Sequence, residues 1–461
     1  MARVQFVDKA PDGGWGWVVV AGTFFIHVVV IASLVSFGVF YAEFREVFKE
    51  GAGTTSFISS ILGATLLMCS PFVSALSNLT SCRAVIIAGS VISAVGLIVS
   101  FFAQRMVHLF LSVGIVTGLG FSLMYSPSLA MIGRYFDERH ATANGIAICG
   151  TGVGQFALPP LFQFLIDEFG WRGALLIVAG ILLNGCVFGA LFRPIHLKED
   201  SREEHVEREK QNSCSDPKQS KGVASLRQIM ETFDVTLLKH RPFLLYGTSL
   251  LGTVLGMSII YVHLVAHAQI LGVEKTQAAF LLSIMGVSDA ISRPINGWLS
   301  DRGMISKVYY YTIGITGLAI STTAIPFGTT YAGLVVCMVF YGFFSGVFHP
   351  LIAVLVRKYS GVSRISGGLG WTFVFQGVAF LLGPPVAGWL YDATGSYDMS
   401  FYVAGIFTFL SVIVLLVIPC STTSTRKKLG SDGSEIPDQT VDKSVVLKEV
   451  KRVGDVNSSV S

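Results

Sequence analysis

Charged residues are scarce in this chain of 461 residues. Only 13% of its residues are Asp, Glu, Lys or Arg, whereas 52% are hydrophobic. Soluble globular domains carry about 25% charged residues. A chain this apolar is not expected to bind nucleic acid, and its composition indicates a protein that crosses a membrane several times.

Signatures of catalysis and of bound cofactors are also missing. No Walker motif, cofactor signature or catalytic triad is present, and the Gly-rich stretch GTGVG at 150–154 lacks the Gly-Lys-Ser/Thr ending of a phosphate loop. The seven cysteines show no CxxC or metal-ligand spacing, and several lie within apolar runs. We therefore expect a protein that is not an enzyme and that holds no metal or cofactor.

Long apolar runs, in contrast, follow one another along the chain. A helix needs roughly 20 apolar residues to cross a membrane, and runs of this length in lipid are helices. No cleavable signal-peptide pattern precedes the first run, so we expect it to be a span as well. The sequence predicts twelve spans, at 15–40, 57–77, 84–103, 107–131, 143–166, 173–192, 242–271, 277–299, 308–326, 331–356, 365–391 and 398–419.

A long polar interval separates the first six predicted spans from the last six. We expect a cytoplasmic N-terminus at 1–14, two six-helix bundles at 15–192 and 242–419, a linker at 193–241 and a disordered tail at 420–461. With the N-terminus inside, the inner segments hold 27 of the 33 Lys and Arg residues and the outer loops hold five. This bias predicts that both termini and the linker are cytoplasmic.

The two halves share an internal repeat. Residues 152–181 align without gaps to residues 377–406, at an offset of 225 residues. The coinciding positions include Pro159 and Pro384, Pro160 and Pro385, Asp167 and Asp392, and Gly170 and Gly395. Twelve spans in two parallel six-helix halves are typical of major facilitator transporters, and GWLSDRG at 297–303 is similar to a loop motif of that superfamily.

Two motifs resemble those of the monocarboxylate transporter family. PDGGWGWVVV at 11–20 resembles the signature that opens the first helix of that family, and RYFDERHATANGIAICG at 134–150 resembles its second signature. Similarity continues through FGWRGALLI, GALFRPI and LLGPP and covers essentially all twelve spans, and SPSLAMIGRYF is most similar to the creatine-carrying branch. The resemblance implies an all-α major facilitator fold and a secondary carrier in the plasma membrane. Members of this family often need a single-pass immunoglobulin-type partner to reach the surface, so the resemblance implies such a partner too.

Away from the span ends, only two charged residues fall inside the predicted spans, Asp289 and Arg293. They lie four residues apart and share one helix face, and an Arg at the bilayer centre costs about 2.5–3.5 kcal/mol. The matching positions of the first half are Ala64 and Met68, so the fold does not need these charges.

Two interpretations of this pair are open. Asp289 and Arg293 either neutralise each other as a structural pair, or Arg293 offers its planar fork to a substrate carboxylate. In the second interpretation, Asp289 orients Arg293, exchanges with the substrate or takes a proton. The family resemblance favours the second, because the matching Asp and Arg in span eight of the family are taken as its substrate and proton site.

The first span departs from the family pattern. Members that couple protons to lactate carry a lysine at the position of Val35, and this span has no Lys or Arg at all. Valine cannot bind an anion or a proton as lysine does. We therefore favour a creatine-type zwitterion, whose carboxylate would meet Arg293 and whose guanidinium would meet Asp289. Proton-coupled lactate or pyruvate symport is the alternative.

Several uncharged residues are further candidates for the substrate path. Phe348 matches the phenylalanine of span ten that narrows this path in the family, or it is one packed aromatic among 34 phenylalanines. Tyr125 lies close to a proline that would bend span four. Asn144 and Gln155 either line the cavity or bond between helices. His263, near the outer end of span seven, is a candidate lining residue, and no third ligand for a metal accompanies it.

Overall fold

A computed structural model describes residues 6–7, 10–193, 195–197, 235–302, 305–361 and 364–431 of the chain. Most of the predicted linker, at 198–234, and the last part of the predicted tail, at 432–461, lie outside the described residues. One compact unit ends at Leu416, and a second, C-terminal unit begins at Val417. The site described below lies entirely within the first unit.

The described part of the chain is almost entirely helical. The helices of the first half are α1 (Gly16–Val29), α2 (Ile31–Ser36), α3 (Gly38–Phe48), α4 (Ala52–Leu79), α5 (Cys82–Ser100), α6 (Met106–Leu109), the π-helix η1 (Phe110–Thr117), α7 (Gly118–Tyr135) and α8 (His140–Ala190). Those of the second half are the 3-10 helix η2 (Val235–Lys239), α11 (Arg241–Ile270), α12 (Lys275–Asp301), α13 (Lys307–Ala324), the 3-10 helix η3 (Ile325–Phe327), α14 (Tyr331–Ser360), α15 (Ile365–Thr394) and α16 (Asp398–Ser431). Two-residue strands β1 (Phe6–Val7) and β2 (His196–Leu197) pair in parallel.

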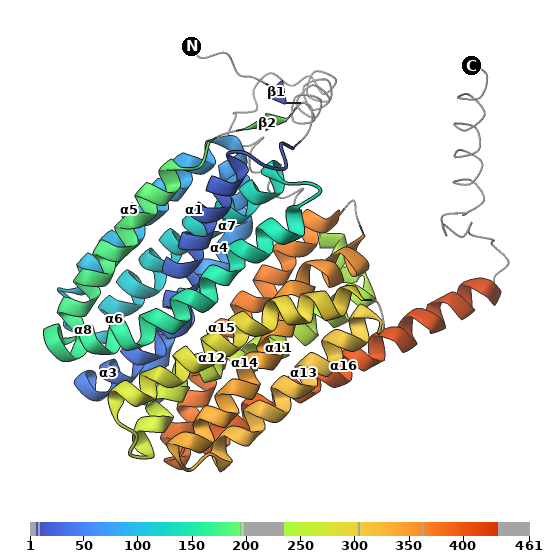
Figure 1. Ribbon diagram of the computed structural model, residues 1–461. Helices are drawn as coiled ribbons and strands as arrows, with labels where there is room; N and C mark the ends of the chain where they lie inside the picture. Colours follow the sequence, from blue (N-terminus) through green and yellow to red (C-terminus); the bar gives the residue numbers. More distant parts are fainter. Residues whose placement is uncertain are drawn as a thin grey trace, which may run out of the picture. The chain divides into compact units, whose positions relative to one another are not determined.

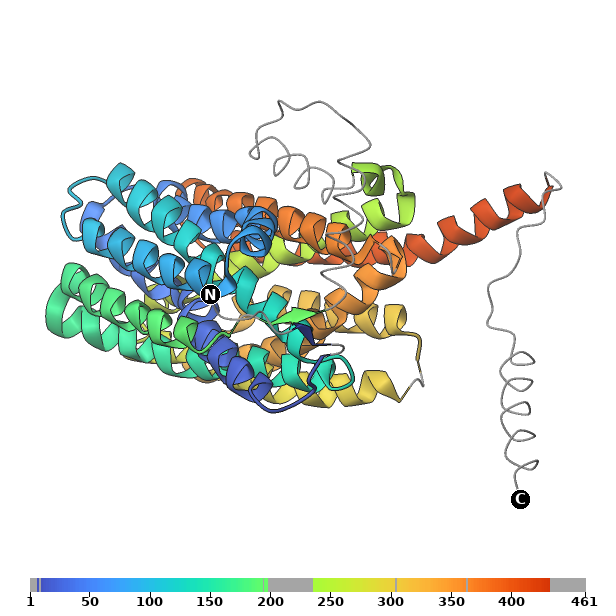
Figure 2. The same ribbon diagram turned by 90° about the horizontal axis from the view of Figure 1, so that it is seen from above.

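The helices account for the predicted spans. Ten of the described helical runs are long and apolar enough to cross a membrane. One of them, within α8, is 49 residues long, and the non-helical backbone at Gly170 divides it into two helices, each long enough for one span. It contains spans five and six, and α13 with its 18 residues corresponds to span nine. The helices of both halves run along one common direction (Figures 1 and 2).

The repeat seen in the sequence is also present in the backbone. The helix α8 begins at His140 and α15 begins at Ile365, which is the same offset of 225 residues. Gly170 interrupts α8 with a φ of 66°, and Gly395 ends α15 with a φ of 74°. Only glycine adopts a positive φ without a steric cost. The matching glycines therefore both end the fifth helix of their half with a positive φ, although their ψ angles differ, at 167° for Gly170 and 1° for Gly395.

The two halves meet along helices with small residues. The principal contacts between them are α4 with α15, α8 with α12, and α3 with α11. At Gly388 of α15, a Cβ atom would lie only 2.5–2.6 Å from backbone atoms of Ala52 and Gly53. Such close backbone approach depends on glycine and is typical of helix packing in membranes.

Two predicted helix boundaries differ from the structure. The first predicted span, at 15–40, consists of the three segments α1, α2 and α3, and it continues to Phe48, where Lys49 ends it in a left-handed conformation with a φ of 54°. The last helix, α16, continues to Ser431. The boundary that we predicted after residue 419, between a span and a disordered tail, is therefore not a helix end.

Candidate functional site

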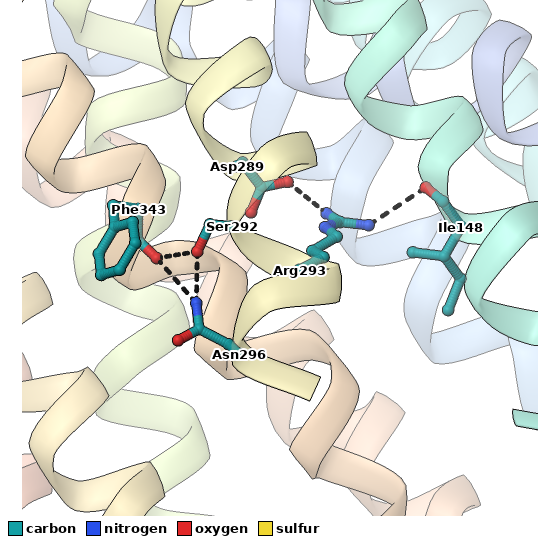
Figure 3. A network of polar contacts seen from close by, with 6 residues as sticks. All are labelled: Ile148, Asp289, Ser292, Arg293, Asn296 and Phe343. Carbon is teal, nitrogen blue, oxygen red and sulfur yellow. Dashed lines mark hydrogen bonds and ion pairs between the residues drawn. The ribbon is translucent and has the colours of Figure 1, made fainter. Parts of the chain in front are cut away.

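The two predicted intramembrane charges form an ion pair on α12. Arg293 Nη2 lies 2.6 Å from Asp289 Oδ2 (Figure 3). Their spacing of four residues places both on one face of the helix. Pro294 follows directly inside α12, and because proline has no N–H, the carbonyl of Ala290 loses its bond within the helix. The pair therefore lies where the backbone is locally more polar.

This pair is unique in its burial among the described residues. Asp289 is 4% exposed and Arg293 is 8% exposed, and no other described Asp, Glu, Lys or Arg is buried. Each nonetheless keeps an unused polar atom, because Asp289 Oδ1 and Arg293 Nε have no hydrogen-bond partner among the described residues. Leaving buried polar atoms unpaired costs about 1–3 kcal/mol each. The pair is therefore not a fully satisfied structural unit.

Arg293 also connects the two halves of the molecule. Its Nη1 donates to the carbonyl oxygen of Ile148 on α8, at 3.2 Å (Figure 3). The guanidinium thus bridges a carboxylate of the second half and a backbone carbonyl of the first. A ligand that engages Arg293 acts directly on the boundary between the halves.

A second set of polar contacts holds α12 beside the ion pair. Ser292 donates to the carbonyl of Phe343 on α14, and Asn296 donates to Ser292 (Figure 3). Tyr310 of α13 donates to Asn296 Oδ1 at 2.6 Å. These bonds hold α12 against its neighbours in the second half, so the ion pair is presented from a rigid element.

The ion pair faces a cavity of about 990 Å³, a size typical of small-molecule sites. Three of the four predicted lining residues contribute to it, namely Val35, Tyr125 and Asn144. The cavity extends to residues 80–83 and to His140, at the end of the helices where the sequence predicts the cytoplasm. No described lining residue comes from the connections at the opposite end, at 49–51, 101–105, 271–274 and 395–397.

Phe348 and His263, in contrast, do not line this cavity. Phe348 is 1% exposed and stacks on Tyr311 at a centroid distance of 6.1 Å. Its neighbour His349 faces the cavity instead, because successive residues point about 100° apart around a helix. His263 binds the carbonyl of Pro384 at 2.8 Å in a buried contact. The interpretation of Phe348 as a packed aromatic therefore fits the structure, and His263 serves helix packing.

Other side chains complete the cavity wall around the ion pair. They include two histidines, a tyrosine, two phenylalanines and a glutamine from five different helices, namely His27, His349, Tyr261, Phe373, Phe380 and Gln155. The sequence marks the two histidines as rare polar residues of predicted spans, and this is the signal that could have identified them. Their orientation toward the cavity could not be deduced without the helix rotation.

Contacts between the halves close the end opposite the cavity. The Asp392 carboxylate accepts bonds from the backbone N–H groups of Ala52 at 2.8 Å and Gly53 at 3.0 Å, and so caps α4. Arg45 donates to Tyr397 Oη at 3.1 Å and lies over the ring of Tyr391. Closed contacts at one end and a cavity at the other are the geometry of one state of an alternating-access carrier.

The two signature motifs bind each other at the end where the cavity opens. Asp12 Oδ1 accepts from the backbone N–H of Asp137 at 2.8 Å and of Arg139 at 3.3 Å. Desolvation acts to raise the pKa of the Asp12 carboxyl, but these backbone bonds lower it below its usual value. Trp15 Nε1 donates to Leu191 O at 2.9 Å. The first signature therefore docks on the second and is more than an interface anchor.

Comparisons with known proteins agree with this architecture. The Major Facilitator Superfamily profile matches residues 23–309 and 247–455. Monocarboxylate transporter 12 of Xenopus laevis is 39% identical over 97% of this chain and 96% of its own length. Monocarboxylate transporter 13 of Rattus norvegicus is 39% identical over 91% and 93%, and monocarboxylate transporter 4 of Mus musculus is 35% identical over 89% and 84%.

Solved structures of other transporters share the fold. A crystal structure of the peptide transporter POT in complex with sulfate has a TM-score of 0.67 at 13% identity, over 90% of this chain and 97% of that one. A POT family transporter in complex with 5-aminolevulinic acid has a TM-score of 0.65 at 16% identity, over 89% and 98%. At these identities the likeness concerns the fold alone.

Proposed function

The chain belongs to the monocarboxylate transporter family of the major facilitator superfamily, and on this premise we propose that it carries a creatine- or guanidinoacetate-type zwitterion across the membrane. As a member of this family it is a transporter and not an enzyme. One observation carries the proposal. The only buried charges of the described residues form a pair of opposite sign in the cavity, and each member keeps an unused polar atom.

A zwitterion matches this pair in both charges. Its carboxylate takes the guanidinium of Arg293, while its guanidinium takes the carboxylate of Asp289, which gives up the 2.6 Å contact between them. Every buried charge then has a partner of opposite sign before and after binding. Binding therefore avoids the free-energy cost of leaving a buried charge unpaired. A simple monocarboxylate that binds Arg293 leaves the charge of Asp289 without its cation.

The wall formed by the first span supports the same substrate class. Its lining residues are His27, Ile31, Leu34 and Val35. None of these is a Lys or Arg that would supply a second cation for an anionic substrate. Arg83 and Arg134 also line the cavity, but they are not buried, so charge balance in its buried part depends on Asp289 and Arg293.

Proton-coupled symport of lactate or pyruvate is the second candidate. Asp289 favours it, because an acid with an unused Oδ1 in the cavity is a suitable proton carrier when an anion occupies Arg293. Initial uptake of labelled creatine and labelled lactate, each at an outside pH of about 6 and about 7.5, separates the two. Creatine uptake without pH dependence supports the proposal. Acid-stimulated uptake of lactate alone refutes it in favour of the symporter.

The proposed orientation places both termini in the cytoplasm and the protein in the plasma membrane. The distribution of Lys and Arg supports this, with 27 of 33 on the side of the termini. The cavity then opens to the cytoplasm, and the contacts of Asp392 and Arg45 close the outer end. A C-terminal epitope that binds antibody in intact cells, without permeabilisation, would contradict this orientation.

A further inference from the structure

The interface between α8 and α12 passes directly beside the ion pair. The two helices run antiparallel, and Gly286, one turn before Asp289, contacts Gln155 of α8. The successive contacts along the interface are Ser283 with Phe156, Gly286 with Gln155, Gly152 with Ala290, and Arg293 with Ile148. The position of Gln155 relative to Asp289 is therefore set by backbone packing on both sides.

The absence of a side chain at Gly286 makes room for the Gln155 amide. A Cβ atom at Gly286 would lie 2.8 Å from both Cβ and Cγ of Gln155 and 3.1 Å from its Cδ. Residues three apart on a helix have Cβ atoms about 5–6 Å apart, and side chains lean toward the N-terminus of their helix. The carboxylate of Asp289 thus leans toward the turn that holds the Gln155 amide.

A donor and an acceptor are both unused at this place. Gln155 is 4% exposed and lines the cavity, and its Nε2 has no hydrogen-bond partner among the described residues. The same is true of Asp289 Oδ1. Buried polar groups are nearly always paired, so an unused donor and an unused acceptor in the wall of one cavity need an explanation.

We propose that Gln155 is a positioning residue that receives the Asp289 carboxylate when a substrate carboxylate occupies Arg293. This proposal rests on the proposed function, since it needs a substrate anion at Arg293. In the empty cavity Asp289 holds Arg293 at 2.6 Å. On binding, Asp289 gives up Arg293, and one of its oxygens accepts from the Gln155 Nε2 donor while the other accepts from the substrate guanidinium, so the carboxylate stays ionised.

The Gln155 amide determines whether Asp289 must take up a proton when the substrate binds. A buried carboxylate that loses its cation without a new donor takes up a proton from solution, whereas a donor bound to the carboxylate favours the ionised form. Gln155 therefore makes substrate binding independent of outside pH, because the substrate guanidinium replaces only part of what Arg293 gives up and the amide supplies the rest. Without this amide, the same step would consume one proton per substrate.

The other ionisable groups around Asp289 come from four more helices. Besides Arg293 on α12 itself, they are Tyr261 of α11, Tyr341 and His349 of α14, His27 of α1 and Tyr125 of α7. The helix α8 presents His140 to the cavity only at its first residue. Tyrosines stay neutral at physiological pH, so the histidines are the groups that a test must separate from Asp289.

The test compares wild type with Gln155→Leu, which removes the donor at similar volume. Initial uptake of labelled creatine is measured at an outside pH of about 6 and about 7.5 and normalised to surface protein. The ratio of uptake at about pH 6 to uptake at about pH 7.5 should be near one for wild type. For the variant it should be on the order of tenfold, because each pH unit changes the rate of a one-proton step up to tenfold. Gly286→Ala displaces the amide without changing Gln155 and should give the same result.

Gln163→Leu is the matched control. Gln163 lies two turns further along α8, outside the cavity, and its Nε2 already binds Asp167 at 2.8 Å. Its ratio should equal that of wild type. A flat pH profile in both Gln155→Leu and Gly286→Ala, with normal surface levels, overturns the proposal.

Two further outcomes are distinct. If wild type takes up lactate but not creatine, and the ratio measured with lactate still rises only in the Gln155 variant, the proposed substrate is wrong and this inference holds. Acid-stimulated uptake by wild type overturns the inference. Loss of the acid stimulation of Gln155→Leu on adding His349→Gln or His27→Gln also overturns it, because a histidine would then be the titrating group.

Discussion

Replacing Arg293 by Lys tests the central element of the site. The substitution keeps a positive charge beside Asp289, so the buried carboxylate is still compensated and the protein should reach the surface. It removes the planar fork that contacts Asp289 at 2.6 Å and Ile148 O at 3.2 Å. Lysine has a single ammonium and cannot bind a carboxylate through two parallel bonds.

The magnitude follows from the lost bond to the substrate carboxylate. A hydrogen bond to a charged group contributes about 1.5–3 kcal/mol, and about 1.4 kcal/mol corresponds to a factor of ten. The efficiency of creatine uptake, taken as the maximal rate divided by KM, should therefore fall roughly 10- to 100-fold. The assay is initial uptake of labelled creatine over a range of concentrations, normalised to surface-biotinylated protein.

The matched control is Arg105→Lys. Arg105 is exposed at the start of α6, outside the cavity, and the same chemical change there should leave uptake unaltered. An uptake efficiency of Arg293→Lys within about twofold of wild type, a difference below 0.5 kcal/mol, would refute the role of the fork. An equal loss in both variants would refute it as well.

Three further variants test other parts of the structure. Asp392→Ala removes the cap of α4, which contributes about 0.5–2 kcal/mol, and so weakens the closed outer end. A cysteine placed at Val35, in the cavity, should then react faster with an impermeant thiol reagent added outside. An unchanged labelling rate would contradict a closing role of Asp392. Asp12→Ala should lower the surface abundance of the protein several-fold, because a loss of about 1–2 kcal/mol of folding stability has this effect. Uptake per surface molecule should not change. Quantitative surface biotinylation measures the abundance. Phe348→Leu should leave KM for creatine within about twofold, whereas Phe373→Leu, in the cavity wall, should change it more; the reverse order would mean that the cavity is assigned wrongly.

Much of the helix arrangement could be predicted from sequence because it depends on local composition and on the repeat. The offset of 225 residues pairs Gly170 with Gly395, and both have a positive φ. Apolar length placed most spans within a few residues. The extension of α16 to Ser431 could not be predicted in this way, because its residues after 419 carry no apolar signal.

The central pair of the site was also predictable, whereas its surroundings were not. The cost of a charge in lipid singles out Asp289 and Arg293 without any structure. Whether Phe348 or His349 faces the cavity depends on the rotation of α14, which packing against α12 and α13 determines. Similarly, the pairing of Asp392 with the start of α4 joins residues 340 positions apart in the chain, and no pattern in either segment predicts it.

The bond between Asp12 and Asp137 has a consequence for how the protein is made. Its partners lie 125 residues apart, and ribosomes add about 5–20 residues per second. At that rate, roughly 6–25 seconds pass between synthesis of the first signature and synthesis of the second. During this interval the N-terminus has no partner, and four helices must enter the membrane before it finds one. The first helix therefore acquires this anchor only when the fifth begins, so a ribosome stalled before residue 137 leaves a chain in which Asp12 still lacks its partner.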